Sequence, residues 1–259
     1  MSTKERTLNR FEGKKVYLTG AASGIGQATA IRLASEGASL YLTDLNEEGL
    51  AGTAEQCKKY GAKVVTAKLD VSSQTQVKAT IADCTKQLGG IDAVLNIAGV
   101  LLIEHFEKTT LEQFDFLVNI NIKGTFMVCQ EAMPHLLASG GNIVNCSSSS
   151  AYCGVGYGVL YGATKGAVSA MTRGIAVEFA KKGIRCNTII PGEVSTSMTA
   201  QPAMPDPESL DFSLMSRGNP LTGQAATPDQ IASVIVMLAS EDGAYINGAE
   251  IRADGGGLS

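Results

Sequence analysis

A tyrosine and a lysine four residues apart, Tyr161 and Lys165, have the types and the spacing that point most directly to chemistry. Side chains at positions i and i+4 of a helix lie on one face, one turn apart. At ~4 Å and an effective dielectric of about 20, a lysine ammonium stabilises a phenolate by roughly 4 kcal/mol. The pair can therefore act as a base near neutral pH. On its own, the same spacing is equally that of a half-buried tyrosine beside a solvated lysine.

Four consecutive serines, Ser147–Ser150, follow a predicted strand and precede the tyrosine. A serine hydroxyl at the end of a strand can hold and polarise a carbonyl or alcohol oxygen while Tyr161 moves the proton. A serine run is also an ordinary loop composition. The residues therefore supply a candidate proton relay and leave open which serine takes part.

A glycine-rich turn, Thr-Gly-Ala-Ala-Ser-Gly-Ile-Gly at residues 19–26, lies between a predicted strand and a predicted helix. Gly20, Gly24 and Gly26 allow a tight turn and let backbone N–H groups approach a pyrophosphate at the helix N-terminus. Glycines interrupt many strand–helix turns, and this spacing differs from G-x-G-x-x-G. The position of the turn, after the first strand and before a helix, favours nucleotide binding.

Asp44 ends the second predicted strand, 24 residues after Gly20. A carboxylate there can accept hydrogen bonds from an adenosine ribose and would repel a 2′-phosphate. No arginine or lysine occupies residues 21–24 or 43–46, so NAD is favoured over NADP, although Asp44 could simply form a turn. Asp70 and Val71 follow the third strand and are expected at the adenine edge, where Asp70 could also cap a helix.

The elements that must position these residues alternate along the whole chain. Continuous apolar runs predict strands covered on both faces, at 16–19, 39–43, 63–67, 93–96, 142–146, 184–190 and 251–253. Helical patterns lie between them at 25–36, 46–60, 73–88, 111–138, 161–182 and 228–240. This alternation predicts an α/β fold, a single doubly wound (Rossmann-type) domain with a seven-stranded, mostly parallel sheet flanked by helices.

The predicted domain covers residues 13–259, after an N-terminal arm of residues 1–12. Within it, residues 192–226 contain four prolines and three methionines but no predicted strand or helix. A structureless stretch of that length in a compact domain suggests a substrate lid.

Composition excludes several classes of function. The chain has 259 residues and a net charge of −4, which gives no electrostatic footprint for nucleic acid. Its two histidines, His105 and His135, lie 30 residues apart, and no Cys-x-x-Cys pair is present, so no metal site is expected. We find neither a signal-like N-terminus nor an apolar run long enough for a bilayer. We expect a cytoplasmic protein with no membrane partner.

Taken together, the motifs resemble the short-chain dehydrogenase/reductase family over roughly residues 13–257. Residues 19–26 are similar to the family's T-G-x-x-x-G-x-G cofactor loop, and residues 161–165 to its Y-x-A-S-K motif. Asn96-Ile-Ala-Gly99 is similar to N-N-A-G, with Ile97 in place of the second asparagine. Residues 191–196 resemble a P-G-x-(Ile/Val)-x-T motif, and residues 246–248 with 254–256 resemble the C-terminal signature.

The resemblance implies a catalytic group of four residues. Ser148 stands thirteen residues before Tyr161, the family's usual spacing, and would orient the substrate, although Ser147 and Ser149 compete for this role. Tyr161 would be the acid/base, and Lys165 would bind the ribose and activate the tyrosine. Asn121, in an N-x-x-G-x-F context that favours it over Asn119, would position a water behind Lys165.

The resemblance and the motifs together assign a set of cofactor contacts for NAD. These are Gly20, Ser23, Gly24, Ile25, Gly26, Asp44, Asp70, Val71, Asn96, Ala98, Gly99, Tyr161, Lys165, Pro191, Gly192, Val194 and Thr196.

The substrate is expected to be a small molecule, a hydrophobic or cyclic secondary alcohol or ketone, because the predicted wall is mostly apolar. Glu193 is either a solvated loop residue or a substrate or gating residue. The expected lining is Val100, Ser149, Ser150, Val155, Glu193 and Met198.

Two alternatives remain: a 3-oxoacyl-carrier-protein reductase and a non-catalytic NAD-binding scaffold. Asp44 and the acidic charge count against the first, and the retained Ser148, Tyr161 and Lys165 count against the second. The resemblance further implies a homo-oligomer, preferably a tetramer, assembled through the predicted helices at 111–138 and 161–182.

Overall fold

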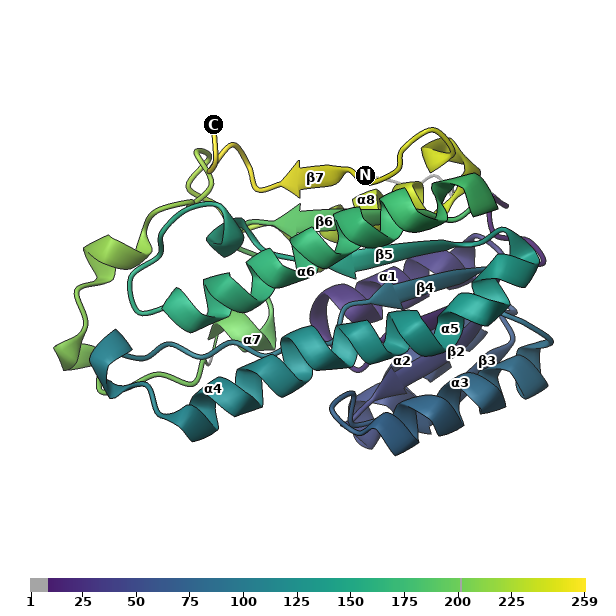
Figure 1. Ribbon diagram of the computed structural model, residues 1–259, viewed down its shortest axis with the longest axis horizontal. Helices are drawn as coiled ribbons and strands as arrows, with labels where there is room; N and C mark the ends of the chain where they lie inside the picture. The colour runs from purple at the N-terminus through teal and green to yellow at the C-terminus, as the bar shows by residue number, and fades with distance from the viewer. Residues whose placement is uncertain (1–8, 201) are drawn as a thin grey trace.

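The computed structural model describes residues 9–200 and 202–259, and its centre is one seven-stranded sheet (Figure 1). The strand order is β3-β2-β1-β4-β5-β6-β7, and every neighbouring pair is parallel. The strands are β1 (Lys15–Thr19), β2 (Ser39–Asp44), β3 (Val64–Lys68), β4 (Ala93–Asn96), β5 (Asn142–Cys146), β6 (Arg185–Pro191) and β7 (Glu250–Ala253). This confirms the predicted fold class.

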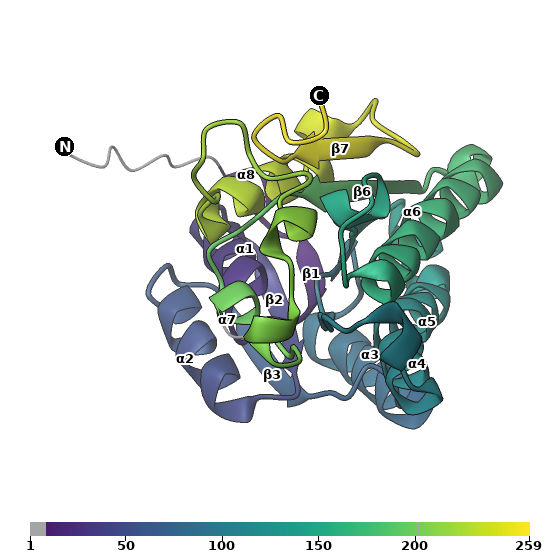
Figure 2. The same cartoon turned by 90° about the vertical axis from the view of Figure 1, so that its left-hand side faces the viewer.

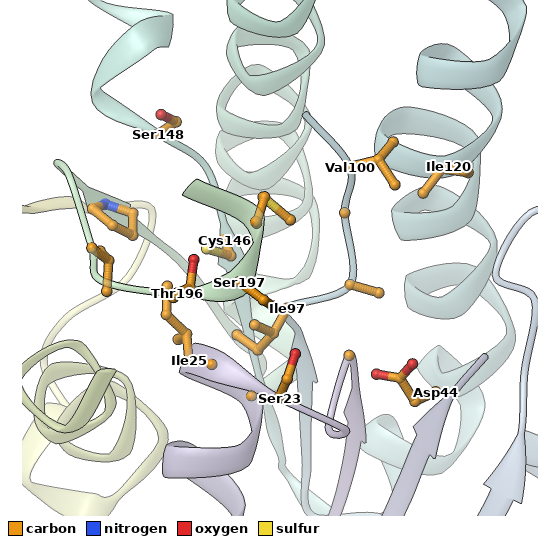
Figure 3. Close-up of a pocket in the computed structure, with 18 of the residues that line it drawn as sticks. Ser23, Ile25, Asp44, Ile97, Val100, Ile120, Cys146, Ser148, Thr196 and Ser197 are labelled. Carbon is orange, nitrogen blue, oxygen red and sulfur yellow. The ribbon is translucent and has the colours of Figure 1, made fainter. Parts of the chain in front are cut away.

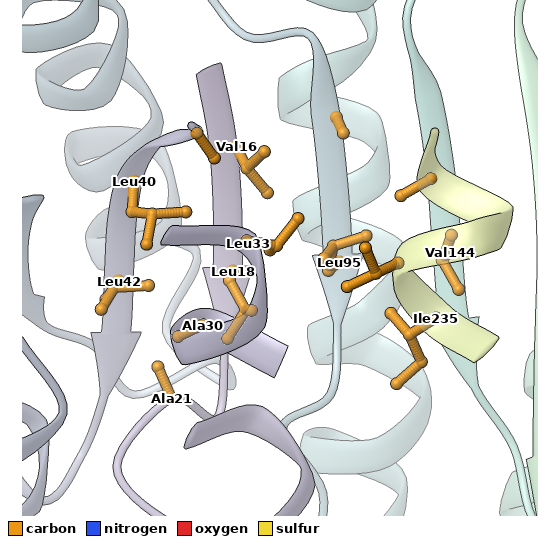
Figure 4. Close-up of a cluster of buried hydrophobic side chains, with 14 of the residues drawn as sticks. Val16, Leu18, Ala21, Ala30, Leu33, Leu40, Leu42, Leu95, Val144 and Ile235 are labelled. Carbon is orange, nitrogen blue, oxygen red and sulfur yellow. The ribbon is translucent and has the colours of Figure 1, made fainter. Parts of the chain in front are cut away.

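Helices cover both faces of the sheet (Figure 2). They are α1 (Gly24–Ser35), α2 (Glu47–Lys58), α3 (Gln74–Leu88), α4 (Leu111–Leu117), α5 (Thr125–Ser139), α6 (Val159–Phe179), α7 (Ser197–Ala200) and α8 (Pro228–Ala239). Because successive strand side chains point to opposite faces, β1 contributes to two cores. Val16 and Leu18 pack in a cluster with Leu33 of α1 and Ile235 of α8 (Figure 4). Tyr17 packs on the opposite face, in a cluster that contains residues of α3 and α5.

The helix predicted over 111–138 is confirmed as one continuous helical element, although its geometry changes along its length. It consists of α4, a π-helical segment Val118–Gly124, and α5. A side chain at Gly124 would lie 2.9 Å from Val71 Cγ2, so this glycine lets the segment approach the loop after β3. Such π-helical insertions often occur at functional sites. The helix predicted over 161–182 begins earlier, at Val159, and its α-helical part ends at Phe179.

The 192–226 segment contains more structure than predicted. Besides α7, it forms the 3₁₀ turns Pro207–Ser209 and Phe212–Met215. The carboxylates of Asp206 and Asp211 accept hydrogen bonds from backbone N–H groups inside these turns. Turns this short have no hydrophobic period from which they could be predicted.

The described part of the N-terminal arm packs against the domain. Phe11 is 1% exposed and belongs to the same core cluster as Val16. Arg10 forms an ion pair with Glu36 at the end of α1. Residues 1–8 of the predicted arm lie outside the described residues.

Candidate active site

A cavity of about 350 Å³ opens at the carboxyl ends of the strands, where β1, β2, β4, β5 and β6 end (Figure 3). In an open parallel sheet this edge is the usual place for a ligand. Most predicted site residues line this cavity. They are Gly20, Ser23, Gly24, Ile25, Gly26, Asp44, Asp70, Val71, Ala98, Gly99, Val100, Ser148, Tyr161, Lys165, Pro191, Gly192, Val194, Thr196 and Met198.

The glycine-rich turn is packed too closely for side chains. A Cβ at Gly26 would lie 1.9 Å from the carbonyl oxygen of Gly20, which itself has a φ of +74°. Gly24 has a φ of +53°, and a Cβ there would lie 3.1 Å from Thr196 Cγ2. The turn leads directly into α1, whose N-terminus carries a partial positive charge. This backbone cradle fits the pyrophosphate of a dinucleotide.

Asp44 lies at the end of β2 with its carboxylate held in place from two sides. Its Oδ2 accepts a hydrogen bond of 2.9 Å from the N–H of Ala22, and its Oδ1 accepts one of 2.9 Å from Asn46. The group is half-buried on the cavity wall. Figure 3 shows Asp44 at the opposite end of the cavity from Ser148. A carboxylate that could accept hydrogen bonds from a ribose and the predicted catalytic residues therefore line the same cavity.

Asp70 lines the cavity but does not cap α3. Its Oδ1 accepts hydrogen bonds from the backbone N–H and hydroxyl of Ser72, at 2.9 and 2.7 Å. The N-cap of α3 is Ser73, whose hydroxyl accepts from the N–H of Gln76. The expectation that Asp70 could also be the cap is therefore wrong.

The serines after β5 face different surroundings. Ser147 also borders the cavity but is 2% exposed, and its hydroxyl donates to the carbonyl oxygen of Lys165, at 2.8 Å. It also accepts from the Ser169 hydroxyl, at 3.0 Å. Ser149 is buried and lies away from the cavity wall. Ser148 lines the cavity, and its Oγ accepts only the N–H of Ser150 among the described hydrogen bonds.

Lys165 is 5% exposed and lies on the same face of α6 as Tyr161. Its Nζ donates a hydrogen bond of 2.9 Å to the carbonyl oxygen of Cys146 and lies 5.8 Å from the centre of the Tyr161 ring. A Cβ at Gly99 would lie 3.2 Å from this Nζ. The ammonium is therefore enclosed between β5, the loop after β4 and the tyrosine.

Asn121 occupies the π-helical segment and is 1% exposed. Its Oδ1 accepts from the N–H of Val100 at 2.9 Å, and its Nδ2 donates to the carbonyl of Val100 and to Thr164 Oγ1, both at 3.0 Å. The side chain thus ties the loop after β4 to α6, behind the cavity wall. Its predicted role with a water stays a prediction.

Asn96 is also buried behind the cavity wall and does not line the cavity itself. Its Nδ2 donates to Asn145 Oδ1 at 2.8 Å and to Cys129 Sγ at 3.3 Å. The loop that follows is held by Thr19, whose hydroxyl accepts from the N–H groups of Ile97 and Ala98, both at 3.2 Å. Asn96 therefore supports the predicted cofactor contacts without lining the cavity.

Four predicted substrate residues do not line this cavity: Ser149, Ser150, Val155 and Glu193. Glu193 lines a separate hollow beside α1, with Gln27 and Asp229. The cavity is also lined by residues that the sequence did not predict as site residues, among them Leu45, Ile120, Cys146, Ser197 and Thr199. Leu45 and Ser197 are direct neighbours of predicted residues, whereas Ile120 comes from the unpredicted π-helical segment.

Cys146 is a neutral wall residue, because burial raises the pKa of its thiol. No group of three or more potential metal ligands occurs among residues 9–200 and 202–259. No helix in the described part of the chain is long and apolar enough to cross a membrane.

The fold and the cavity together define a dinucleotide-binding protein with a serine, a tyrosine and a lysine at the far end of its cleft. A family model described as "Enoyl-(Acyl carrier protein) reductase" matches residues 20–257. The chain belongs to the short-chain dehydrogenase/reductase family of oxidoreductases, which confirms the resemblance seen in its motifs.

Several curated relatives match nearly the whole chain. "Dehydrogenase/reductase SDR family member 6" of Xenopus laevis is 35% identical, covering 96% of this chain and 99% of the relative. A 3-oxoacyl-(acyl-carrier-protein) reductase of Thermotoga maritima is 35% identical, covering 95% and 98%. Meso-2,3-butanediol dehydrogenase of Serratia marcescens is 35% identical, covering 95% of each chain.

Solved structures show the same fold. Levodione reductase superposes with a TM-score of 0.85 at 33% identity, over 95% of this chain and 98% of that one. A short-chain dehydrogenase from Mycobacterium paratuberculosis bound to NAD has a TM-score of 0.89 at 26% identity, over 96% and 99%. One from Burkholderia cenocepacia in complex with NADP has a TM-score of 0.87 at 27% identity, over 96% and 100%. These neighbours support a nicotinamide cofactor of either kind.

Proposed function

We propose that this protein is an NAD-dependent dehydrogenase/reductase of a hydrophobic or cyclic secondary alcohol or ketone. The observation that carries the proposal is that Ser148, Tyr161 and Lys165 line the same cavity as the glycine-rich turn and Asp44. Ser148 and Asp44 lie at opposite ends of it (Figure 3).

The choice of NAD rests on Asp44. Its carboxylate lies where a ribose diol would bind, and residues 21–24 and 43–46 contain no basic side chain to pair with a 2′-phosphate. The hydrogen bond from Ala22 keeps the carboxylate beside the glycine-rich turn. A 2′-phosphate would meet this negative charge at close range, which disfavours NADP.

In the proposed mechanism, the nicotinamide supplies or accepts a hydride when bound. Ser148 donates a hydrogen bond to the substrate oxygen and orients it. Tyr161 moves the proton to or from that oxygen at its Oη. Lys165 stabilises the phenolate electrostatically, and its hydrogen bond to Cys146 keeps the ammonium in place. Asn121 fixes the loop at Val100 against α6, so the relay and the substrate wall keep their spacing.

The substrate class follows from the uncharged side chains that line the cavity. Val100, Ile120 and Met198 lie on the cavity, and none carries a charge. A phosphorylated substrate would find no cation there except Lys165, which is already enclosed. An apolar alcohol or ketone would bury its surface against these side chains.

The test is an initial-rate screen with NAD and with NADP across cyclic alcohols, steroids, polyols and hydroxy acids, and across the corresponding ketones. The proposal expects turnover with NAD and an apolar secondary alcohol. Absence of turnover with every substrate and both cofactors would favour the NAD-binding scaffold instead.

The Thermotoga relative favours one second candidate, a 3-oxoacyl-carrier-protein reductase. An acidic carrier would need an exposed basic surface, for which Lys181, Lys182 and Arg185 are the candidates. The guanidinium of Arg185, however, donates hydrogen bonds to the carbonyl oxygens of Leu238 and Ser240. Faster turnover of a 3-oxoacyl thioester with NADPH than of any alcohol with NAD would establish this alternative.

We also propose a cytoplasmic homo-oligomer, a tetramer by family resemblance. Apolar side chains are exposed on the helices expected to assemble it, and these are Leu111, Phe114, Phe116, Phe126, Leu137, Val159 and Val177. Light scattering of the purified protein gives the mass of the assembly, and fractionation of cells gives its location. A monomer at micromolar concentration would contradict the first proposal.

A further inference from the structure

Tyr157 has an unusual backbone conformation. Its φ is +61°, and it is the one non-glycine residue with a positive φ in the described part of the chain. A bulky side chain persists in this region only where its surroundings determine the conformation. Tyr157 stands directly before Gly158, the N-cap of α6, and four residues before Tyr161. The strain therefore lies at the entrance to the helix that carries the proposed catalytic pair.

The contacts that hold Tyr157 come from the lid and from the loop after β4. Its Oη accepts a hydrogen bond of 3.0 Å from the N–H of Asp211, and its carbonyl accepts one of 2.9 Å from Glu104. Its ring meets the His105 ring edge-on, with 5.0 Å between centroids and an interplanar angle of 71°. His105 Nε2 in turn lies 3.2 Å from Ser209 Oγ. Tyr157 and His105 thus hold both 3₁₀ turns of the lid.

Two backbone hydrogen bonds attach the same part of the lid, residues 203–215. The N–H of Gly156 donates to the carbonyl of Leu214, and the N–H of Ile103 donates to that of Ala203, both at 2.9 Å. In Figure 1 the yellow-green lid turns lie at the left-hand end of the molecule, where α4 and α6 begin. The lid therefore joins the loop after β4 to the segment before α6, at the edge of the sheet where the strands end.

The backbone bonds depend little on side-chain identity, whereas the contacts of Tyr157 and His105 depend on it directly. When the lid lifts, Tyr157 loses its bond to Asp211, and its left-handed conformation loses part of the support that opposes its strain. Opening of the lid and relaxation of the segment before α6 are therefore coupled.

We propose that Tyr157 is a positioning residue which, paired with His105, holds the lid closed over the substrate end of the cavity and so determines substrate retention and size selectivity. The selectivity part rests on the proposed dehydrogenase function, whereas the anchoring of the lid does not.

Amide hydrogen exchange of the full chain, without substrate, tests the anchor alone. Tyr157→Phe keeps the ring and removes the acceptor, so the Asp211 amide should exchange about tenfold faster, the effect of losing a single hydrogen bond. Tyr60→Phe, an exposed tyrosine beyond the end of α2, is the matched control and should leave lid exchange unchanged. Wild-type exchange at Asp211 in Tyr157→Phe would overturn the anchor.

Steady-state kinetics with a substrate found by the screen test the selectivity. Tyr157→Phe should raise KM about threefold to tenfold while kcat changes by less than about twofold, because closure retains substrate without taking part in proton transfer. Tyr157→Gly, which suits the positive φ, should also reduce discrimination against bulkier analogues. An unchanged KM and unchanged discrimination would overturn the selectivity role. If the wild-type chain turns over no substrate, the proposed function fails while the exchange result still decides the anchor.

Discussion

The ammonium of Lys165 donates a hydrogen bond of 2.9 Å to the carbonyl oxygen of Cys146, the last residue of β5. The bond links the N-terminal half of α6 to β5, the strand that precedes Ser147–Ser150. The buried cation therefore helps to hold α6, which carries Tyr161, against β5, which leads to Ser148. In the proposed mechanism Lys165 would therefore act both through its charge and through its position.

Replacement of this lysine should damage the site in two ways. Lys165→Met removes the charge that stabilises a phenolate, so turnover should fall about a hundredfold or more. It also leaves the Cys146 carbonyl without its donor. Measured kcat and cofactor affinity should both decline. Lys181→Met, in an exposed turn, is the control and should retain wild-type values; equal activity of the two variants would contradict the assignment.

Tyr161→Phe should separate chemistry from binding. The ring stays in place while the proton-transferring hydroxyl is lost, so turnover should fall by about a thousandfold, within the range of general acid–base catalysis. The affinity for NADH, measured by the change in cofactor fluorescence on binding, should change by less than about threefold. Normal turnover would remove Tyr161 from the mechanism.

Asp44 should decide between the two cofactors. Asp44→Ser loses the charged acceptor, and NAD should bind about tenfold to a hundredfold more weakly, the effect of losing charged hydrogen bonds. Asp44→Asn retains an acceptor oxygen and removes only the charge, so it should mainly relieve the repulsion of NADP. The ratio of kcat/KM for NAD and NADP measures both effects. A wild-type preference for NADP would refute the role of Asp44.

Two glycine-to-alanine substitutions should act in opposite directions. In Gly26→Ala the new methyl group would lie 1.9 Å from the Gly20 carbonyl, so the turn must shift and both stability and cofactor affinity should fall. Gly52→Ala lies on α2 with nothing within 4 Å and should stabilise the protein by about 0.5–1 kcal/mol. Urea denaturation measures the change in the free energy of unfolding of each variant. Equal stability of the two variants would show that the turn is not tightly packed.

Glu36 should contribute a pH-dependent part of the stability. Burial alone would raise the pKa of this carboxyl, but hydrogen bonds from Arg10 and Arg32 outweigh it and hold the pKa below its ordinary value of 4.5. A lowered folded pKa stabilises the protein above the unfolded pKa, and this stability is lost as the pH falls through the folded value. The free energy of unfolding should therefore decline below about pH 4.5.

Glu36→Gln tests this contribution. The variant should lose about 2 kcal/mol at pH 7, since both arginines lose a charged partner. Its stability should also decline less between pH 4.5 and 3 than that of the wild type. Glu48→Gln, at an exposed position, serves as the control for the general effect of losing a carboxylate. Parallel pH profiles for Glu36→Gln and the wild type would exclude Glu36 as the source.

Local sequence patterns were sufficient to predict the alternation of strands and helices and to find the motifs. The continuous apolar runs around Val16 and Leu40 are buried on both faces, so their composition reports the sheet directly. The four-residue spacing of Tyr161 and Lys165 places both on one helix face whatever the rest of the chain does. The same local patterns did not reveal the π-helical segment before Thr125, because its geometry depends on contacts with Val71 and Val100.

By itself, the sequence determined the fold class, the glycine-rich turn, the acidic end of β2 and the tyrosine–lysine pair. Each of these depends on residues that are neighbours along the chain or on one element. Only the tertiary structure decided that the Ser147 hydroxyl is hydrogen-bonded to Lys165 and Ser169, that Glu193 faces a separate hollow, and that Tyr157 is hydrogen-bonded to Asp211. Those outcomes are set by contacts between segments far apart in sequence, and no periodicity or spacing encodes them.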